Sequence, residues 1–173
     1  MLIDVLVIII AIINSLVRLL PVALYSGSIV SYLVFNDFRG NLLFMGFLMN
    51  ELIALAYNKA LKGVSKSECA LLADQSNFYV LPSSITQTIG FFFGFMMADS
   101  YYKNNFRSTA FILLCILLAM TIFSRVNVGC EGIMNALTFA VLGSFIGMAY
   151  YYVVRDYYHA DLDNIKKDND FFD

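Results

Sequence analysis

The residues of this sequence that could bind or transfer a phosphate group lie in three polar stretches at or near the ends of apolar segments. Asn50 and Glu51 lie in the first segment, "LPSSITQ" at 81–87 opens the second, and "FSRVNVGCEGIMN" at 123–135 follows the third. Serine hydroxyls and an arginine fork can hold phosphate oxygens, and a carboxylate can attack phosphorus. Chemistry with a histidine nucleophile cannot be built there, because the one histidine, His159, lies in a hydrophilic tail.

These stretches must be positioned by helices in a membrane. The chain has 173 residues, of which 60% are hydrophobic and 14% charged, and a soluble domain of this size would need far more polar surface. Since a spanning helix needs about 20 apolar residues, the sequence predicts an all-α integral membrane helical bundle. Pro21 either bends one long first helix or separates two short ones, which gives five or six transmembrane helices. The expected spans are 3–20, 22–35, 42–61, 79–98, 109–124 and 131–154.

The bundle is expected over residues 1–154, and residues 155–173 form a tail with six aspartates against three basic residues. The first residues of the chain carry an acidic side chain, Asp4, rather than a basic one, and no small-residue cleavage site follows. We therefore interpret this segment as a retained helix rather than a signal peptide. Six Lys and Arg on the tail side against four on the other predict a cytoplasmic tail. The polar stretches would then face the lumen or the exterior.

The polar stretches resemble the motifs of the type 2 phosphatidic acid phosphatase and haloperoxidase superfamily, especially its dolichyl-diphosphatase-like branch. The resemblance runs from about residue 24 to 154 and follows the family order K-x6-R-P, P-S-x-H and S-R-x5-H-x3-D. In that family the second histidine attacks phosphorus, the aspartate orients it, the first histidine protonates the leaving group, and lysine and arginines hold the phosphate. The resemblance implies a phosphatase-like membrane bundle.

Most of the family's catalytic positions carry other residues here. Ile85 replaces the acid histidine, Glu131 the nucleophile and Asn135 its aspartate. Because losing one member of a cooperating set costs orders of magnitude in rate, we expect a protein without catalytic residues. The degenerate phosphate-pocket positions are Asn58, Ser65, Ser83, Ser84, Ile85, Arg125, Glu131 and Asn135.

The expected function is therefore that of a non-catalytic, phosphatase-like multi-pass membrane protein with a structural or organising role. Members of the superfamily also occur in large DNA viruses with internal membranes, so the resemblance raises a role that links such a membrane to a capsid or protein shell. The alternatives are a lipid-phosphate binder that uses Ser83, Ser84, Arg125 and a lysine, and an active lipid (pyro)phosphatase with altered residues. Membrane lipids are the expected partners, with protein partners at the tail or loops. No basic stripe suggests nucleic acid, and no His–Cys cluster suggests a metal or cofactor.

Several single residues carry further expectations. Glu131 is expected to pair with Arg125 or with a lysine on the same face. Glu51 is expected to make a structural hydrogen bond inside the bundle. Arg18 either reaches the lipid headgroups or faces the bundle. Tyrosines 150–152 and 157–158 are typical of an aromatic belt at the membrane surface.

Two residue pairings remain open from the sequence. Gly90 with Gly94, and Gly143 with Gly147, have the spacing that lets helix backbones approach closely, either within the bundle or between copies of the chain. The three cysteines form no metal-binding motif. A disulfide between Cys69 and Cys130 is possible in principle.

Overall fold

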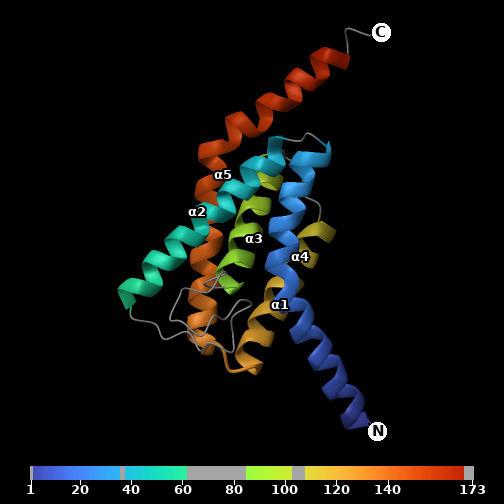
Figure 1. The fold of residues 1–173 in the computed structure, drawn as a ribbon, viewed down its shortest axis with the longest axis vertical. Helices are drawn as coiled ribbons and strands as arrows, with labels where there is room; N and C mark the ends of the chain where they lie inside the picture. Colours follow the sequence, from blue (N-terminus) through green and yellow to red (C-terminus); the bar gives the residue numbers. More distant parts are fainter. Residues whose placement is uncertain (1, 36–37, 62–84, 103–107, 170–173) are drawn as a thin grey trace.

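The computed structural model describes residues 2–35, 38–61, 85–102 and 108–169 of the chain. The described residues form five α-helices (Figure 1), which confirms the predicted all-α bundle. The helices are α1 (Leu2–Phe35), α2 (Phe38–Leu61), α3 (Ile85–Tyr102), α4 (Ser108–Asn127) and α5 (Ile133–Asn169).

The first two predicted spans are one helix. Pro21 lies inside α1, which runs without interruption for 34 residues. Proline is tolerated in such helices because the surrounding structure can satisfy the backbone group that it leaves free. The described part of the chain therefore has five helices, while the predicted number of transmembrane helices stays a prediction.

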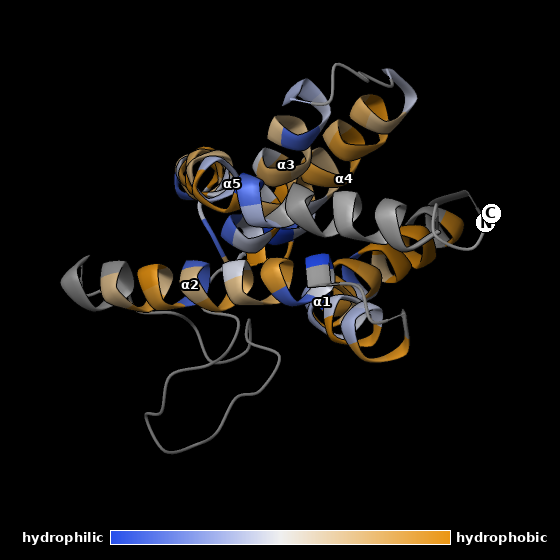
Figure 2. Ribbon diagram, turned by 90° about the horizontal axis from the view of Figure 1, so that it is seen from above, coloured by the Kyte–Doolittle hydropathy of each residue, from blue (hydrophilic) through white to orange (hydrophobic). Residues whose placement is uncertain are grey.

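Three of the described helices are long and apolar enough to cross a membrane: α1 over Val7–Val34, α4 over its whole length, and α5 over Ile133–Tyr157. Their outward side chains are apolar; Leu33, Leu113 and Phe145, for example, are each more than 60% exposed. In Figure 2 the hydrophobic colour runs along α1 and α4. These faces suit contact with lipid tails.

The third helix is largely enclosed by the others, and ten of its 18 residues are buried. Thr86, Gln87 and Thr88 near its start are each at most 1% exposed. Polar side chains inside a bundle need partners from neighbouring helices rather than from water. In this protein α3 therefore holds its polar groups in the centre, where a site can be built.

The most extensive helix–helix contact in the described residues joins α3 to α5. All four glycines of the two predicted pairs are buried there, and a Cβ on any of them would collide with a backbone carbonyl of the other helix. The packing interpretation of these glycines thus holds within the chain. An oligomer through the same faces stays a prediction, and it would require α3 and α5 to separate. The opposed pairs are Gly90 with Ala140, Gly94 with Ser144, Gly143 with Gln87, and Gly147 with Phe91.

The predicted aromatic belt is only partly at the surface. Tyr151 is fully buried and packs edge-on against Phe95, with ring centroids 5.4 Å apart. Tyr150 is half-buried, and its hydroxyl donates a hydrogen bond to the Leu42 carbonyl oxygen at 2.7 Å. These two tyrosines tie α5 to α3 and α2 because their rings face the bundle centre. Among the described side chains of the set, those of Tyr152 and Tyr157 are exposed, and that of Tyr158 lies outside the described residues.

Both chain ends project beyond the bundle as helix. The start of α1 leaves the other helices at the end where α4 meets α5, and α5 continues past the opposite end (Figure 1). The residues expected to form a hydrophilic tail are thus helical as far as Asn169.

Candidate functional site

A glycine turn positions the polar groups between α4 and α5. Gly129 has φ +74°, a left-handed conformation that glycine adopts without a Cβ penalty. The turn brings the chain back over the end of α4, so the backbone N–H groups of Cys130 and Glu131 both donate to the Arg125 carbonyl oxygen, at 3.0 and 3.4 Å. The local sequence "RVNVGCE" thus places Glu131 beside Arg125.

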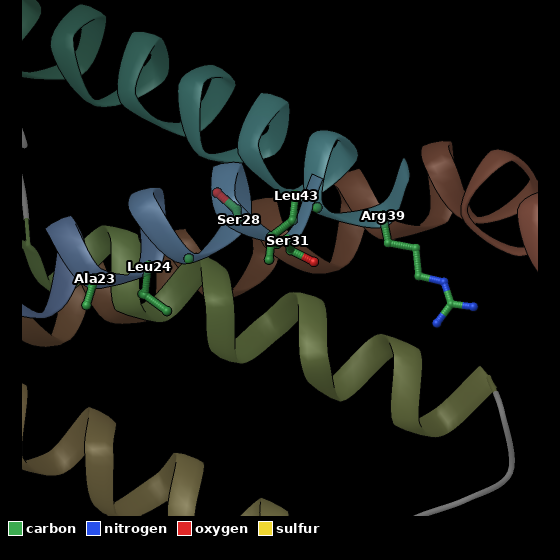
Figure 3. A pocket seen from close by; sticks show the side chains of 8 residues that line it. Ala23, Leu24, Ser28, Ser31, Arg39 and Leu43 are labelled. Carbon is green, nitrogen blue, oxygen red and sulfur yellow. The ribbon is translucent and has the colours of Figure 1, made fainter. Parts of the chain in front are cut away.

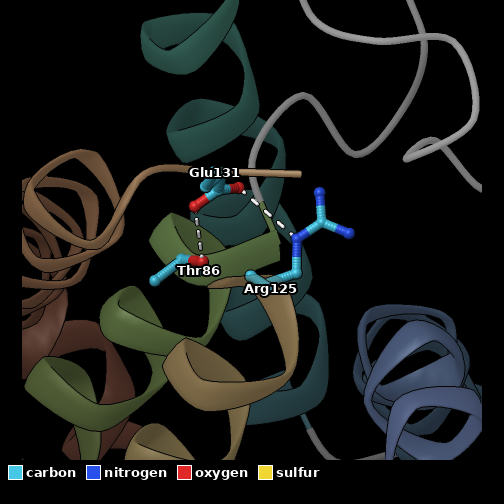
Figure 4. Close-up of polar contacts among 3 residues, drawn as sticks. All are labelled: Thr86, Arg125 and Glu131. Atoms are coloured by element: carbon cyan, nitrogen blue, oxygen red, sulfur yellow. Dashed lines mark hydrogen bonds and ion pairs between the residues drawn. The ribbon is translucent and has the colours of Figure 1, made fainter. Parts of the chain in front are cut away.

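Glu131 is held by two side chains from different helices (Figure 4). Its Oε1 lies 3.5 Å from Nε of Arg125, and its Oε2 accepts a hydrogen bond from the Thr86 hydroxyl at 2.9 Å. Both partners of the ion pair have side chains that are 12% exposed. The expected pairing of Glu131 with Arg125 is confirmed. Sequence reasoning missed Thr86, although it follows Ile85 directly in "SSITQT".

The position that the resemblance gives to the acid histidine lies in an apolar cluster. Ile85 is 2% exposed and packs with Val17 of α1 and Ile89 of α3. An isoleucine in such surroundings supplies no proton and no contact for a phosphate oxygen.

Of the remaining degenerate positions, Asn135 is the one whose side chain the structure describes. Asn135 is exposed in the first turn of α5. Asn58 lies in α2, but its side chain is outside the described residues, as are Ser65, Ser83 and Ser84 altogether. Helix α3 begins at Ile85, directly after the two serines.

The single histidine is far from this group. His159 lies 26 residues beyond Ile133 in the same helix, which corresponds to about 39 Å at a rise of about 1.5 Å per residue. Because α5 starts beside Glu131 and runs away from it, the backbone of His159 is at the other end of the molecule (Figure 1).

A buried polar layer adjoins the site deeper in the bundle. Gln87 Nε2 donates to Asn50 Oδ1 at 3.1 Å, and Glu51 beside it is 4% exposed. Tyr25 of α1 lies close to both Glu51 and Thr88. Glu51, expected to make a structural hydrogen bond inside the bundle, is buried where α2 faces α1 and α3.

Two polar cavities lie against α1. One, of about 150 Å³, is lined by Asn14, Ser15 and Arg18 of α1 and by Ser124 and Arg125 of α4. Arg18, expected either at the headgroups or facing the bundle, thus lines a cavity together with Arg125.

The other cavity, of about 270 Å³, lies between α1 and α2 at the opposite end. There the Arg39 side chain extends away from Ser28 and Ser31 (Figure 3), so its charge is not gathered with their hydroxyls.

Cys130 in the α4–α5 turn is disulfide-bonded, whereas Cys115 is a free thiol. Cys69, the partner that the sequence left open for Cys130, lies outside the described residues. Among the described residues, no group of three or more His, Cys, Asp or Glu side chains could hold a metal ion.

The arrangement offers a guanidinium, a hydroxyl and a carboxylate, and so it can bind polar groups.

Comparison with known proteins points the same way as the motifs. No protein-family model matches the chain, and no solved structure matches it. Dolichyldiphosphatase 1 of Dictyostelium discoideum is 29% identical over 149 residues, which cover 82% of this chain and 64% of that relative. This similarity, together with the apolar helices, supports a membrane protein related to phosphatases of the type 2 phosphatidic acid phosphatase kind.

Proposed function

We propose that this protein is a non-catalytic, phosphatase-like membrane protein with a structural or organising role. The observation that carries the proposal is the state of Glu131, which stands where the resemblance puts the nucleophile. Its carboxylate is engaged by Arg125 at 3.5 Å and by Thr86 at 2.9 Å. Both contacts stabilise the charge in the ground state, which lowers its tendency to attack phosphorus.

The residue at the position of the acid histidine supports the proposal as well. General-acid catalysis needs a titratable group within hydrogen-bond reach of the leaving oxygen. The corresponding position here is Ile85, packed in an apolar cluster. A chain with neither an imidazole nucleophile nor a proton donor at these two positions is better suited to holding a membrane or a partner than to turnover.

The test is phosphate release by the purified full-length chain, with phosphatidic acid and a polyprenyl diphosphate as substrates. The matched control is Glu131→Gln, which keeps the shape of the side chain and removes its charge. We expect no release above this variant with either substrate. Turnover that Glu131→Gln abolishes would establish the active (pyro)phosphatase instead.

A structural role would be carried by the two projecting helix ends, which offer surfaces on both sides of the bundle (Figure 1). A link between a membrane and a protein shell, as in viruses with internal membranes, is a proposal that rests on the resemblance alone. Crosslinking of the chain in its native membrane, followed by identification of the crosslinked partners, tests it. Crosslinks confined to lipids would contradict this part of the proposal.

The second candidate is a lipid-phosphate binder, and the orientation of Arg125 favours it. In Figure 4 the two terminal nitrogens of this guanidinium point away from Glu131. Arginine forks bind phosphate oxygens in pairs. Arg125→Ala should therefore reduce the phospholipid that co-purifies with the chain, and equal retention by the variant would reject this candidate.

A further inference from the structure

The outward face of α1 carries a mostly apolar stripe that repeats every seven residues. From Val5 to Leu33 its positions are separated by alternating steps of four and three residues, which makes four repeats of seven. The side chain at each of these positions is exposed in the folded chain, and that of Leu16, for example, is 62% exposed. Asp4 and Arg18, the two charged residues of α1, fall outside the stripe. The stripe therefore presents an uncharged face.

The other side of α1 packs against the bundle. Val17 is 5% exposed in a cluster with Ile85 and Ile89, and Pro21 and Ser28 are buried as well. These buried residues and the stripe follow the same helix on different faces. The stripe is thus the side of α1 that the described part of the chain leaves uncovered.

The repeat of the stripe is typical of contact with another helix. Lipid tails can cover any apolar face, but they impose no repeat of seven. A straight α-helix drifts by about 20° per heptad relative to such a repeat, so four repeats correspond to a drift of about 80°. Keeping the stripe uncharged through this drift fits two helices that wind around each other with a left-handed twist.

Gly27 gives a second observation beside this stripe. A Cβ on Gly27 would meet no described atom within 4 Å, whereas each glycine of α3 and α5 lies against the backbone of the other helix. Glycine inside a helix costs about 1 kcal/mol relative to alanine, and packing within the described chain gives no reason for it here. Ala23 lies four residues earlier, and small residues at this spacing let helices approach closely in membranes. The Ser26 hydroxyl between them donates to the Ala23 carbonyl oxygen at 3.3 Å, so it does not depend on a partner.

The surface at this place is also hollowed. Ala23 and Gly27 line the cavity of about 270 Å³ between α1 and α2. In paired helices, side chains of one helix enter hollows between the side chains of the other. A helix that packs on the stripe could therefore fill this hollow with a side chain of its own.

The start of α1 extends past the end of α4. Asn14 accepts a hydrogen bond from Ser124, three residues before α4 ends at Asn127. Residues 2–13 are mostly apolar and continue for about 18 Å at a rise of about 1.5 Å per residue, leaving the other helices (Figure 1). The candidate span Val7–Val34 has 28 residues, about 42 Å of helix against about 30 Å of hydrocarbon. Such mismatch favours helix association, which would cover the projecting start.

We propose that α1 pairs with α1 of a second copy of this chain along the stripe. Two copies with the same orientation in one membrane have parallel α1 helices, and a two-fold axis then sets each stripe position against the same position of the partner. Because the stripe is uncharged, this symmetric pairing brings no like charges together. The pairing is independent of whether the chain turns over phosphate. It also uses a different surface from the buried glycines of α3 and α5.

Disulfide crosslinking of the full chain in liposomes tests the pairing at a low ratio of protein to lipid. The background variant is Cys115→Ser, because Cys115 is a free thiol. Ile9→Cys and Leu16→Cys put a thiol on the stripe. Val7→Cys is the matched control, because Val7 is similarly exposed but lies about 180–200° around the helix from both, at 3.6 residues per turn. We expect covalent dimers from the two stripe variants and a loss of this product in the control.

A second variant tests the close approach of the helices. Gly27→Leu puts a side chain into space that is open in the single chain, so the fold should be kept while the two α1 helices are held apart. It should weaken dimerisation about tenfold or more, measured by energy transfer between labelled copies as lipid is added. Ala11→Leu is the matched control, because Ala11 is also exposed on α1 but lies off the stripe. It should dimerise like the unmodified chain.

Three results would overturn the inference. A chain that stays monomeric at every ratio of protein to lipid would show that lipid tails cover the stripe. Equal crosslinking at Val7 and at the stripe would indicate random collisions. Dimers that Gly27→Leu does not weaken would place the contact elsewhere. If thermal unfolding shows that Gly27→Leu does not fold, the cysteine variants decide alone, since they change only exposed positions.

Discussion

The carboxylate of Glu131 lies 3.5 Å from Nε of Arg125, and the backbone N–H of the same glutamate donates to the Arg125 carbonyl oxygen at 3.4 Å. The two residues are thus joined twice, once through side chains and once through the turn that Gly129 makes possible. Thr86 completes the contact from α3. The result is a polar contact between α3, α4 and the start of α5, which includes one of the positions that the resemblance assigns to catalysis.

Removing the Thr86 hydroxyl should weaken this polar contact between the helices. Thr86→Val keeps the shape of the side chain but leaves Oε2 of Glu131 without this donor, and the loss of a hydrogen bond to a charged group costs about 1.5–3 kcal/mol. The measurement is the free energy of unfolding in a denaturing-detergent titration. The control is Thr138→Val, because the exposed Thr138 bonds only within its own helix, to the Met134 carbonyl oxygen. Equal stability of the two variants would contradict the prediction.

A histidine at position 85, where the resemblance places the acid histidine, should destabilise the protein without making it active. Ile85→His puts a polar ring into the cluster with Val17 and Ile89, and we expect a loss of about 2–4 kcal/mol in unfolding free energy. Ile85→Val is the control, with an expected cost of about 0.5–1.5 kcal/mol. Phosphate release should stay absent when Glu131→His is added. Detectable turnover in this double variant would show that the scaffold still supports the chemistry.

The glycine contact between α3 and α5 should not tolerate a methyl group. In Gly94→Ala the new Cβ would collide with the backbone carbonyl of Ser144, so the helices must move apart, at a cost of about 1–3 kcal/mol. Gly27→Ala is the control, because a Cβ on Gly27 meets nothing within 4 Å and alanine is favoured in helices. Thermal unfolding midpoints should fall in the first variant and hold or rise in the second. The reverse order would show that this helix contact is not formed.

The oxidation state of the cysteines predicts how many thiols react with maleimide. Cys115 is free and Cys130 is disulfide-bonded, so the denatured chain should react with one maleimide before reduction and with three afterwards, since it has three cysteines. Cys115→Ser should remove the reaction seen before reduction. A count of three without reductant would contradict the disulfide. Mass spectrometry of the unreduced chain reports whether Cys69 is the partner.

The sequence by itself determined that the chain lies in a membrane and that its secondary structure is helical. Its hydrophobic content requires a membrane, and helices satisfy every backbone group within the segment, so an all-α bundle follows. It also limited the partner of Glu131 to Arg125 or a lysine on the same face, and the turn at Gly129 in the structure brings Arg125, six positions away, beside it. The spacing of the glycines predicted a close helix contact, although not which helices would meet.

The tertiary structure decided which distant residues share a space. Thr86 meets Glu131 because α3 packs beside the α4–α5 turn, and Arg18 and Arg125 line one cavity because α1 packs against the end of α4. Tyr150 and Tyr151 face inward for the same reason, since rotation of α5 is set by the glycine contact and not by the tyrosines themselves. Such proximities depend on how helices cross and rotate. A helical period places residues on one face, but only packing between helices decides what that face meets.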